Sequence, residues 1–329
     1  MKKIAILDTS VMSFNIGDQI IMDGSRTALA NTLKDAFVVN FPTHSPLFHR
    51  YEFSLKGKDS FSSALNSLDL KIVCGTNLLE KNMFKRKNTW NIHLGDTKYI
   101  NDIVLMGVGT DGLPKVANWY TKLLYRRALS SKYIHSTRDE KTKEFVESLG
   151  LRAINTGCPT LWSLTEEHCK NITSVKQDKV VFTVTDYKPD YDKDAKMIKT
   201  LQNNYAEVSC WLQGVEDLSY IKSLPLKEEE MNRINFIAPS LNEYDKFLTK
   251  NNCDYVGTRL HAGIRAMQKG RRSIIIGVDN RAKDMNDDVN LNYLDRSNLL
   301  ELDEYIKSEF KTEVKINQES INAYLGQFK

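Results

Sequence analysis

The sequence predicts an α/β protein with parallel sheets, and three observations support this prediction. Short apolar runs alternate with longer amphipathic stretches, as in α/β folds; the runs cover residues 4–7, 72–74, 103–108, 180–184, 234–237 and 273–278. These runs are apolar on consecutive residues, which fits strands covered on both faces in a parallel sheet. A chain of 329 residues also exceeds one ordinary core and suits two domains.

The first predicted strand, residues 4–7, leads into a polar turn before a helix. Asn15, Gly17 and Asp18 stand in this turn. Gly17 permits a tight turn, and Asn15 and Asp18 project where a cleft between two domains would open. Asn and Asp are also common helix caps, so a purely structural role stays open.

Residues 115–132 predict an amphipathic helix. Its apolar residues include Trp119, Tyr120, Leu123, Leu124 and Tyr125, and its basic residues include Lys122, Arg126 and Arg127. We favour a helix that buries its apolar face and keeps a basic outer face, because most amphipathic helices pack on a core. The alternative is a helix that rests on the inner membrane surface.

Residues 136–142 predict a strand-to-helix turn. Thr137 and Glu140 have the spacing of a capping box, which places Arg138 at the start of the helix. A basic residue in a first helical turn opposes the macrodipole, so it favours an anionic partner. That partner is either a bound anion or the neighbouring Asp139.

The boundary between the two halves is expected near residue 170. Residues 163–178 are largely polar, and a strand restarts at residues 180–184. We therefore predict an N-terminal domain of residues 1–170 and a C-terminal domain of residues 171–329. The last helix, after about residue 318, could pack back on the N-terminal domain.

Residues 257–267 are the sharpest segment of the sequence, reading Gly-Thr-Arg-Leu-His-Ala-Gly-Ile-Arg-Ala-Met. They predict the end of a strand, a turn and a helix. Leu260, Ile264 and Met267 have the spacing of the helix's buried stripe.

Arg259 and His261 lie off that stripe, in the first turn of a helix that Thr258 can cap. The turn follows a predicted parallel strand, where open α/β sheets bind ligands, and the free N–H groups of a helix start favour anions. Two interpretations remain. Arg259 and the backbone bind an anion, or Arg259 pairs with a local carboxylate while His261 bonds to loop carbonyls.

Residues 278–287 form a polar stretch after the last strong strand and are expected to be a loop. Lys283 is a candidate cation for the same cleft as Arg259. A solvated run of charges explains the stretch equally well.

Composition narrows the classes of function. Lys and Arg total 46 against 42 Asp and Glu, so nucleic-acid binding is not indicated. Five cysteines without a Cys-x-x-Cys pair indicate neither a disulfide framework nor a zinc site, and the six histidines show no ligand spacing. We expect no metal. The chain start lacks the apolar core of a signal peptide and no run approaches a membrane span, so a cytoplasmic protein is expected.

Together, these segments resemble the polysaccharide pyruvyl transferase family. The matching residues occur in the expected order over nearly the whole chain: Asn-Ile-Gly-Asp at 15–18, Ser-Thr-Arg-Asp at 136–139, Arg-Leu-His-Ala at 259–262 with Ala266, and Lys283. The Arg-Leu-His-Ala segment is the specific part. The sequence departs from the family in having Cys-Gly-Thr-Asn at 74–77, where a run of glycines is common, and Ser273, where a proline is usual.

The resemblance implies two Rossmann-like domains facing a central cleft, as in the GT-B glycosyltransferases. It implies phosphoenolpyruvate as the donor, with no separate cofactor. The acceptor would be a hexose of a repeat unit or cell-wall glycan, often on a lipid carrier. The donor side would lie in the C-terminal domain, and the donor-binding residues would be Arg138, Arg259, Leu260, His261 and Lys283.

Ketal chemistry suggests roles for these residues. The methylene carbon of the donor must be protonated, one sugar hydroxyl then attacks C2, and a second displaces phosphate. His261 is the candidate acid because histidine titrates near neutrality, and Arg138 and Arg259 complete the catalytic candidates. Asn15 and Asp18, from the N-terminal domain, are candidate acceptor contacts.

Three other classes stay as alternatives. A GT-B glycosyltransferase that uses a nucleotide sugar would share the cleft and the basic residues. A non-catalytic sugar-binding protein would keep the fold and tolerate the loss of Arg259 and His261. A dinucleotide oxidoreductase is disfavoured because the first strand lacks Gly-x-Gly-x-x-Gly, and Gly107 and Gly109 precede no evident helix start.

Overall fold

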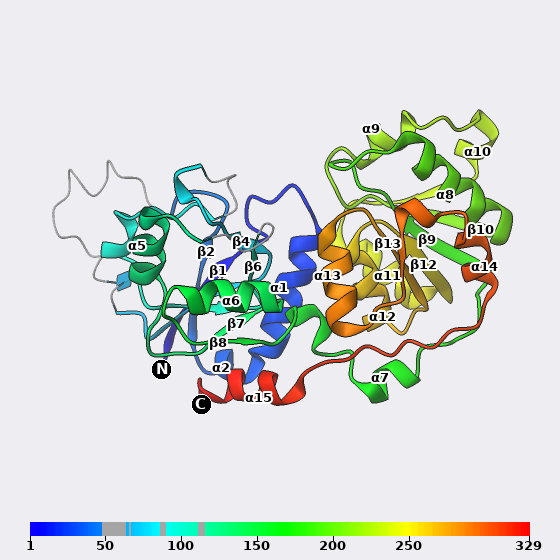
Figure 1. Ribbon diagram of the computed structural model, residues 1–329. Helices are drawn as coiled ribbons and strands as arrows, with labels where there is room; N and C mark the ends of the chain where they lie inside the picture. Colours follow the sequence, from blue (N-terminus) through cyan, green and yellow to red (C-terminus); the bar gives the residue numbers. More distant parts are fainter. Residues whose placement is uncertain (48–63, 66, 86–89, 111–115) are drawn as a thin grey trace. The chain divides into compact units, whose positions relative to one another are not determined.

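The computed structural model describes residues 1–47, 64–65, 67–85, 90–110 and 116–329 (Figure 1). The chain divides into two compact units. Unit 1 comprises Met1–Ser13, Ile21–Trp162 and Asn317–Lys329, and unit 2 comprises Phe14–Ile20 and Ser163–Ile316. The main change from unit 1 to unit 2 therefore falls between Trp162 and Ser163, at the start of the polar stretch 163–178. The sequence had placed this boundary at residue 170.

Unit 1 contains a parallel sheet. Its strands lie in the order β2 (Phe37–Pro42), β1 (Lys3–Asp8), β3 (Leu70–Cys74) and β5 (Ile103–Met106). Two shorter parallel pairs form separate two-stranded sheets: β4 (Asn77–Leu79) with β6 (Gly109–Thr110), and β7 (His135–Thr137) with β8 (Ala153–Asn155). Every residue of β3 and β5 is buried, as the continuous apolar runs predict.

Helices surround this sheet and supply the rest of its core. They are α1 (Gly17–Ala28), α2 (Ala30–Leu33), α5 (Trp119–Ala128), α6 (Glu140–Ser148) and the last helix, α15 (Gln318–Gly326), with short 3₁₀ turns at Met83–Lys85, Asp96–Lys98 and Pro159–Leu161. Phe145 of α6 and Tyr125 of α5 meet edge to face at 6.2 Å, and Trp90 stacks on the same tyrosine.

Helix α15 belongs to unit 1 although it follows the whole of unit 2 in sequence (Figure 1). Tyr324 packs against Trp162 with ring centroids 6.2 Å apart. The side chain of Gln327 accepts a hydrogen bond from the Ile134 N–H and donates one to the Ile134 carbonyl. These contacts hold the end of the chain on the β7 region.

Unit 2 contains a wholly parallel sheet with a reversal of strand order at its centre. The order is β11 (Ile234–Ile237), β10 (Glu207–Trp211), β9 (Lys179–Thr183), β12 (Cys253–Gly257), β13 (Ser273–Gly277) and β14 (Tyr293–Asp295). From β9 the chain builds outward through β10 and β11, and it then returns to β12 and builds the other way. This is the doubly wound arrangement.

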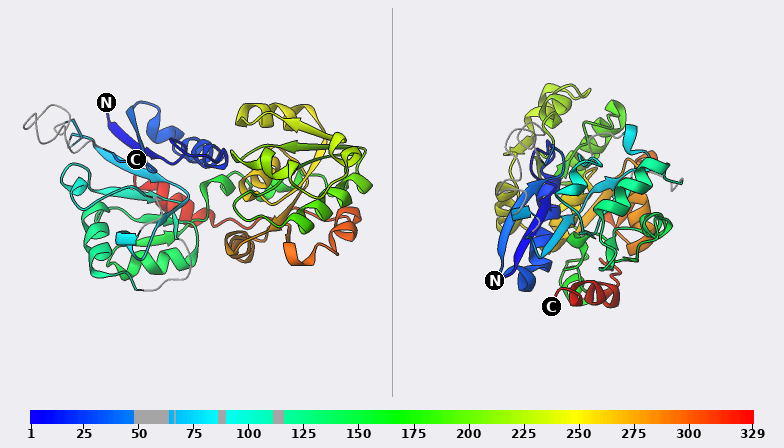
Figure 2. Two further views of the ribbon diagram at one scale, coloured as in Figure 1. Left: turned by 90° about the horizontal axis from the view of Figure 1, so that it is seen from above. Right: turned by 90° about the vertical axis from the view of Figure 1, so that its left-hand side faces the viewer.

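Helices cover both faces of this sheet (Figure 2). They are α8 (Tyr191–Asn204), α9 (Asp217–Lys222), α10 (Glu228–Asn232), α11 (Leu241–Lys250), α12 (Leu260–Gln268), α13 (Asn280–Val289) and α14 (Leu302–Lys307), after the short α7 (Glu166–Lys170). Ile274 and Ile276 of β13 share a cluster with residues of α8 and α14. Ile275, between them, approaches Gly263 of α12 on the opposite face. Strands covered on both faces explain the unbroken apolar runs.

The described helices include none that is both long and apolar enough to cross a membrane.

Candidate functional site

The candidate site of unit 2 lies where β9 and β12 end. These neighbouring strands flank the reversal of strand order, and open α/β sheets bind ligands at such a point. Thr183 of β9 and Gly257 of β12 are paired in register, so the segments that follow the two strands emerge side by side. Arg259 follows β12, and Asp186 follows β9.

Arg259 is held by two carboxylates. Its side chain is only 4% exposed, and its Nη2 forms ion pairs with Asp186, at 2.8 Å, and with Asp217. Its Nε donates to the carbonyl of Val184 at 2.8 Å, and its guanidinium lies 5.3 Å from the ring centre of Tyr187. The structure thus agrees with the interpretation in which Arg259 pairs with a local carboxylate.

Asp217 organises the loop beside Arg259. It is fully buried at the start of α9, and its Oδ2 accepts hydrogen bonds from the N–H groups of Gln213, at 3.0 Å, and Gly214, at 2.6 Å. Burial raises the pKa of Asp217, while Arg259 and these N–H groups act in the opposite direction. A Cβ atom on Gly214 would overlap Nη2 of Arg259. Glycine at this position therefore lets the guanidinium reach its carboxylate.

The start of α12 differs from the expectation that Thr258 caps it. Arg259 is the N-cap residue, and its own side chain makes no capping hydrogen bond. The N–H of Thr258 instead donates to the Thr183 carbonyl at 3.1 Å, continuing the pairing of β12, and its hydroxyl lies 2.8 Å from that of Thr185. The predicted cap was wrong because Thr258 lies one residue before the N-cap position, and its N–H and hydroxyl bond to Thr183 and Thr185. Leu260 and His261, both half-buried, form the first turn of α12.

Arg138, in unit 1, follows β7 in a similar setting. Its Nη2 donates to Asn77 Oδ1 at 2.5 Å, and its Nε lies 3.6 Å from the Asp139 carboxylate. Its side chain is 8% exposed. A Cβ atom on Gly109 would lie 2.6 Å from its Nη2. Arg138 and Arg259 thus each follow the end of a strand and lie against a glycine. Arg138 lies near one carboxylate, that of Asp139, whereas Arg259 pairs with two, those of Asp186 and Asp217.

The capping box predicted for α6 was also wrong. Asp139 is the N-cap, and its Oδ1 accepts from the N–H of Thr142 at 2.8 Å and from its hydroxyl at 2.7 Å. Thr137 belongs to β7 and is paired with Asn155, so its backbone is committed to the sheet and cannot begin the helix.

Asn15 and Asp18 lie in the segment Phe14–Ile20, which groups with unit 2 and not with the N-terminal half, where we expected them. Asn15 Oδ1 accepts from the Gly17 N–H at 3.0 Å and from Gln213 Nε2 at 2.7 Å. The N–H of Ile16 donates to the Gln213 carbonyl at 3.0 Å. This bridge joins the Asn15 turn to the loop that Asp217 holds.

Lys283 is exposed and lies in α13, where a loop was expected. Ala282, Met285 and Val289 are buried and have helical spacing, which the many polar neighbours concealed. The pKa of Asp295 is lowered mainly by hydrogen bonds from Ser297, with a smaller effect from Lys283. Lys283 therefore lies near the end of β14.

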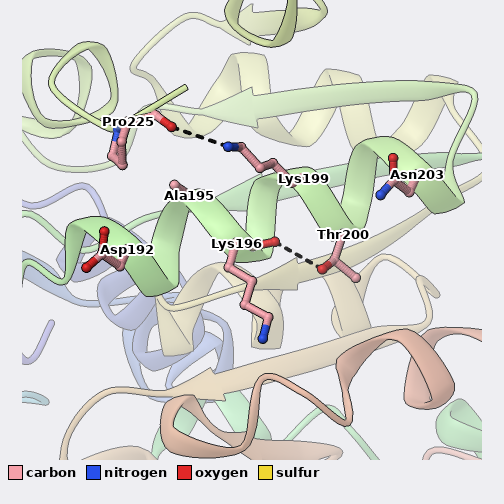
Figure 3. Close-up of a pocket in the computed structure, with 7 residues that line it drawn as sticks. All are labelled: Asp192, Ala195, Lys196, Lys199, Thr200, Asn203 and Pro225. Atoms are coloured by element: carbon pink, nitrogen blue, oxygen red, sulfur yellow. Dashed lines mark hydrogen bonds between the residues drawn. The ribbon is translucent and has the colours of Figure 1, made fainter. Parts of the chain in front are cut away.

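A separate hollow runs along α8 in unit 2 (Figure 3). It is lined by Asp192, Ala195, Lys196, Lys199, Thr200, Asn203 and Pro225. Lys199 Nζ donates to the Pro225 carbonyl at 3.4 Å. None of the residues singled out from the sequence lines it. Over the part of the chain that the structure describes, no group of His, Cys, Asp and Glu side chains is arranged to hold a metal ion.

Sequence reasoning missed the residues around Arg259: its carboxylate partners Asp186 and Asp217, Gly214 against its guanidinium, and Gln213, whose N–H Asp217 accepts. All four follow the carboxyl ends of β9 or β10. Polar residues at that edge of a parallel sheet are candidates wherever the strand order is known. The strand order itself was the missing information.

Comparison with solved structures defines the class of fold as GT-B-like. The UDP-GlcNAc 2-epimerase of Methanocaldococcus jannaschii, in complex with UDP-GlcNAc and UDP, is 14% identical with a TM-score of 0.53, over 99% of both chains. A putative UDP-N-acetylglucosamine 2-epimerase from Listeria monocytogenes is 12% identical with a TM-score of 0.49, over 99% of this chain and 90% of that one. The lipopolysaccharide outer core galactosyltransferase WaaB is 11% identical with a TM-score of 0.48, over 99% and 95%. The similarity to the Methanocaldococcus jannaschii enzyme supports the fold and says nothing about activity.

The family is defined by sequence. The family model for polysaccharide pyruvyl transferases matches residues 15–280, a span that includes Asn15, Arg138, Arg259 and His261 and ends before Lys283. The chain belongs to the polysaccharide pyruvyl transferase family, as its motifs indicated, and it is a transferase. No curated protein matched the chain.

Proposed function

We propose that the protein transfers the enolpyruvyl-derived group of phosphoenolpyruvate onto two hydroxyls of a hexose, forming a cyclic pyruvate ketal. The product would belong to a cell-surface or capsular polysaccharide, and the acceptor sugar could be linked to a lipid. The observation that carries this proposal is the family match over residues 15–280, which contains both arginine turns. Phosphoenolpyruvate acts as donor substrate, and we propose no separate cofactor.

The donor would meet N–H groups and basic side chains. Helix α12 begins at Leu260, directly after Arg259, and the N–H groups at the start of a helix favour an anion. Arg259 and Lys283 of unit 2 and Arg138 of unit 1 are the proposed cations. Arg138 is the less neutralised of the two arginines, because its shortest side-chain hydrogen bond goes to a neutral amide.

The proposed reaction begins at the methylene carbon of the donor. His261 donates a proton to the methylene carbon of phosphoenolpyruvate, leaving C2 cationic. One sugar hydroxyl adds to C2 while its proton returns to His261, and the C2–O bond to phosphate then breaks. The second hydroxyl adds to C2 and its proton leaves with the phosphate, so the products are the ketal and inorganic phosphate. Asn15 and Asp18 remain our candidates for holding the acceptor.

We also propose a peripheral contact with an anionic membrane surface. Helix α5 buries Thr121, Leu124, Tyr125 and Ala128, which fits the interpretation of a core-packed helix; Lys115, at the start of the expected segment, lies outside the described residues. Trp119 is 70% exposed, and Phe84, 60% exposed, lies 5.9 Å from it between ring centroids. Exposed aromatic side chains beside basic ones, here Lys85 and Lys122, suit a membrane interface.

The test is a thermal shift and calorimetric titration with phosphoenolpyruvate, run beside UDP-sugars, followed by assays for phosphate release with hexose acceptors. Stabilisation by phosphoenolpyruvate with acceptor-dependent release of phosphate supports the proposal. Stabilisation by UDP-sugars alone would indicate a glycosyltransferase. No response to either ligand would favour a non-catalytic sugar-binding protein.

A further inference from the structure

The two carboxylates that hold Arg259 differ in burial. The side chain of Asp217 is fully buried, whereas that of Asp186 is 19% exposed. Asp217 also accepts two backbone N–H groups through its second oxygen, so its removal from Arg259 would leave a buried charge. Asp186 can turn toward water at lower cost, because its carboxylate already lies at the surface and would not be left as a buried, unpaired charge.

The guanidinium of Arg259 has little capacity left for a bidentate ligand. Nε is bonded to the Val184 carbonyl, and Nη2 is bonded to both Asp186 and Asp217. A carboxylate or phosphate that binds in bidentate fashion needs N–H groups from two nitrogens. Of the three nitrogens, only Nη1 has no hydrogen bond to a residue that the structure describes. A bidentate anion must therefore displace a partner of Arg259.

We propose that Asp217 is a positioning residue for Arg259, and that Asp186 is a competing carboxylate whose place on Arg259 the donor anion takes. Asp217 keeps the guanidinium fixed against Gly214, and Asp186 neutralises it while the site is empty. The two aspartates thus have opposite effects on anion affinity. This inference rests on the proposed function for the identity of the anion, but its chemistry applies to any carboxylate or phosphate.

The same loop connects Arg259 to the Asn15 turn. Asp217 holds the N–H of Gln213, the Gln213 side chain donates to Asn15, and its carbonyl accepts from Ile16. Loss of the Asp217 carboxylate should therefore also loosen the Asn15 turn. Loss of Asp186 should not, because its described bonds are to Arg259 and to the Tyr187 N–H.

The experiment measures the affinity of the full-length protein for phosphoenolpyruvate and for inorganic phosphate by calorimetry, with turnover assayed in parallel. Asp186→Asn should bind both anions about two- to fivefold more tightly, since it removes a partly exposed competing carboxylate. Asp217→Asn should bind them about tenfold more weakly, since it releases the guanidinium. Asp254→Asn is the matched control, because Asp254 forms another buried pair, with Arg272 at 2.7 Å. It should lower the melting temperature and leave anion affinity unchanged.

Weaker binding by Asp186→Asn, or unchanged binding by Asp217→Asn, would overturn the inference. An equal loss of affinity in Asp254→Asn would also overturn it, because the weaker binding by Asp217→Asn would then be explained by lower stability of the fold. Phosphate binding with the expected rank order, but without pyruvylated product from any acceptor, would count against the proposed function and leave the inference standing. Turnover of phosphoenolpyruvate without that rank order would support the proposed function and overturn the inference.

Discussion

The guanidinium of Arg138 lies directly against Gly109, so closely that a Cβ atom on this glycine would come within 2.6 Å of Nη2. Asn77 Oδ1 would lie at the same distance from that Cβ. One glycine therefore makes room for both members of the Arg138–Asn77 hydrogen bond. A substitution at Gly109 therefore tests whether Arg138 contributes to donor binding.

Gly109→Ala should displace Arg138 and weaken phosphoenolpyruvate binding by about tenfold, as expected for the loss of a charge-assisted hydrogen bond. Calorimetric titration measures the effect, and a thermal melt shows whether the fold persists. Gly326→Ala is the control, because nothing lies within 4 Å of a Cβ there. Equal donor affinity in both variants would remove Arg138 from the donor site.

His261→Gln should lower turnover by about 10²- to 10⁴-fold while phosphoenolpyruvate still binds, because the lost group supplies a proton and glutamine cannot. Steady-state release of phosphate gives the measurement. His168→Gln is a matched control, since His168 is also half-buried and its Nε2 lies 2.8 Å from the Met267 carbonyl. Near-normal turnover by His261→Gln would mean that another group is the acid.

Arg272→Met should destabilise the fold by about 3–5 kcal/mol, because it leaves Asp254 as an uncompensated buried charge. Arg272 is fully buried and also donates to the carbonyls of Ile306, at 2.9 Å, and Ser308, at 2.8 Å. Urea unfolding is the measurement. Arg271→Met, which removes the neighbouring and more exposed arginine, should cost much less. Similar losses in the two variants would contradict the assignment of a special role to the buried pair.

Stability should fall as the pH falls from 6.5 toward 4. Burial lowers the pKa of His135 from 6.5 to about 4, and its Nδ1 accepts a hydrogen bond from the Leu105 N–H at 3.1 Å. Within this window the unfolded chain binds a proton at His135 that the folded protein does not, so acid favours unfolding. The contribution is about 2 kcal/mol between pH 7 and pH 5. Unfolding of wild type and His135→Gln at the two pH values isolates it, and parallel losses in both proteins would exclude His135 as the cause.

Trp119→Ala should reduce binding to vesicles that contain anionic lipids, with little effect on stability, because this side chain is mostly exposed. Co-sedimentation with anionic and with neutral vesicles measures the binding. Phe236→Ala, at an exposed apolar residue on β11 of unit 2, is the control. Wild-type protein that ignores anionic vesicles would exclude a membrane contact at α5.

The parts of the fold that could be predicted were those in which local sequence and tertiary structure agree. The runs at residues 180–184 and 273–278 are strands because both of their faces are covered, and that environment leaves an unbroken apolar signature. The Arg259–His261 turn was placed correctly between a strand and a helix, because the local sequence on each side of it agrees with the strand β12 and the helix α12.

The caps and the partners could not be predicted, because they depend on where strands stop and which strands are neighbours. Thr258 and Thr137 both have good capping chemistry, but the N–H of Thr258 bonds to the Thr183 carbonyl, and Thr137 is paired with Asn155 in a sheet. Asp217 is 42 residues from Arg259 in sequence. Their pairing follows from the strand order, which the sequence did not reveal.

The interleaving of the two units sets the order in which they can be completed during synthesis. Unit 2 has all of its residues once Ile316 has been added, whereas unit 1 still lacks Asn317–Lys329. The first unit to begin emerging from the ribosome is therefore the last that can close its core, since Tyr324 must still reach Trp162. A nascent chain of this protein should expose the β7 and β8 region until residues 317–329 have been added, and a premature stop near residue 316 should leave unit 1, rather than unit 2, for chaperones to hold.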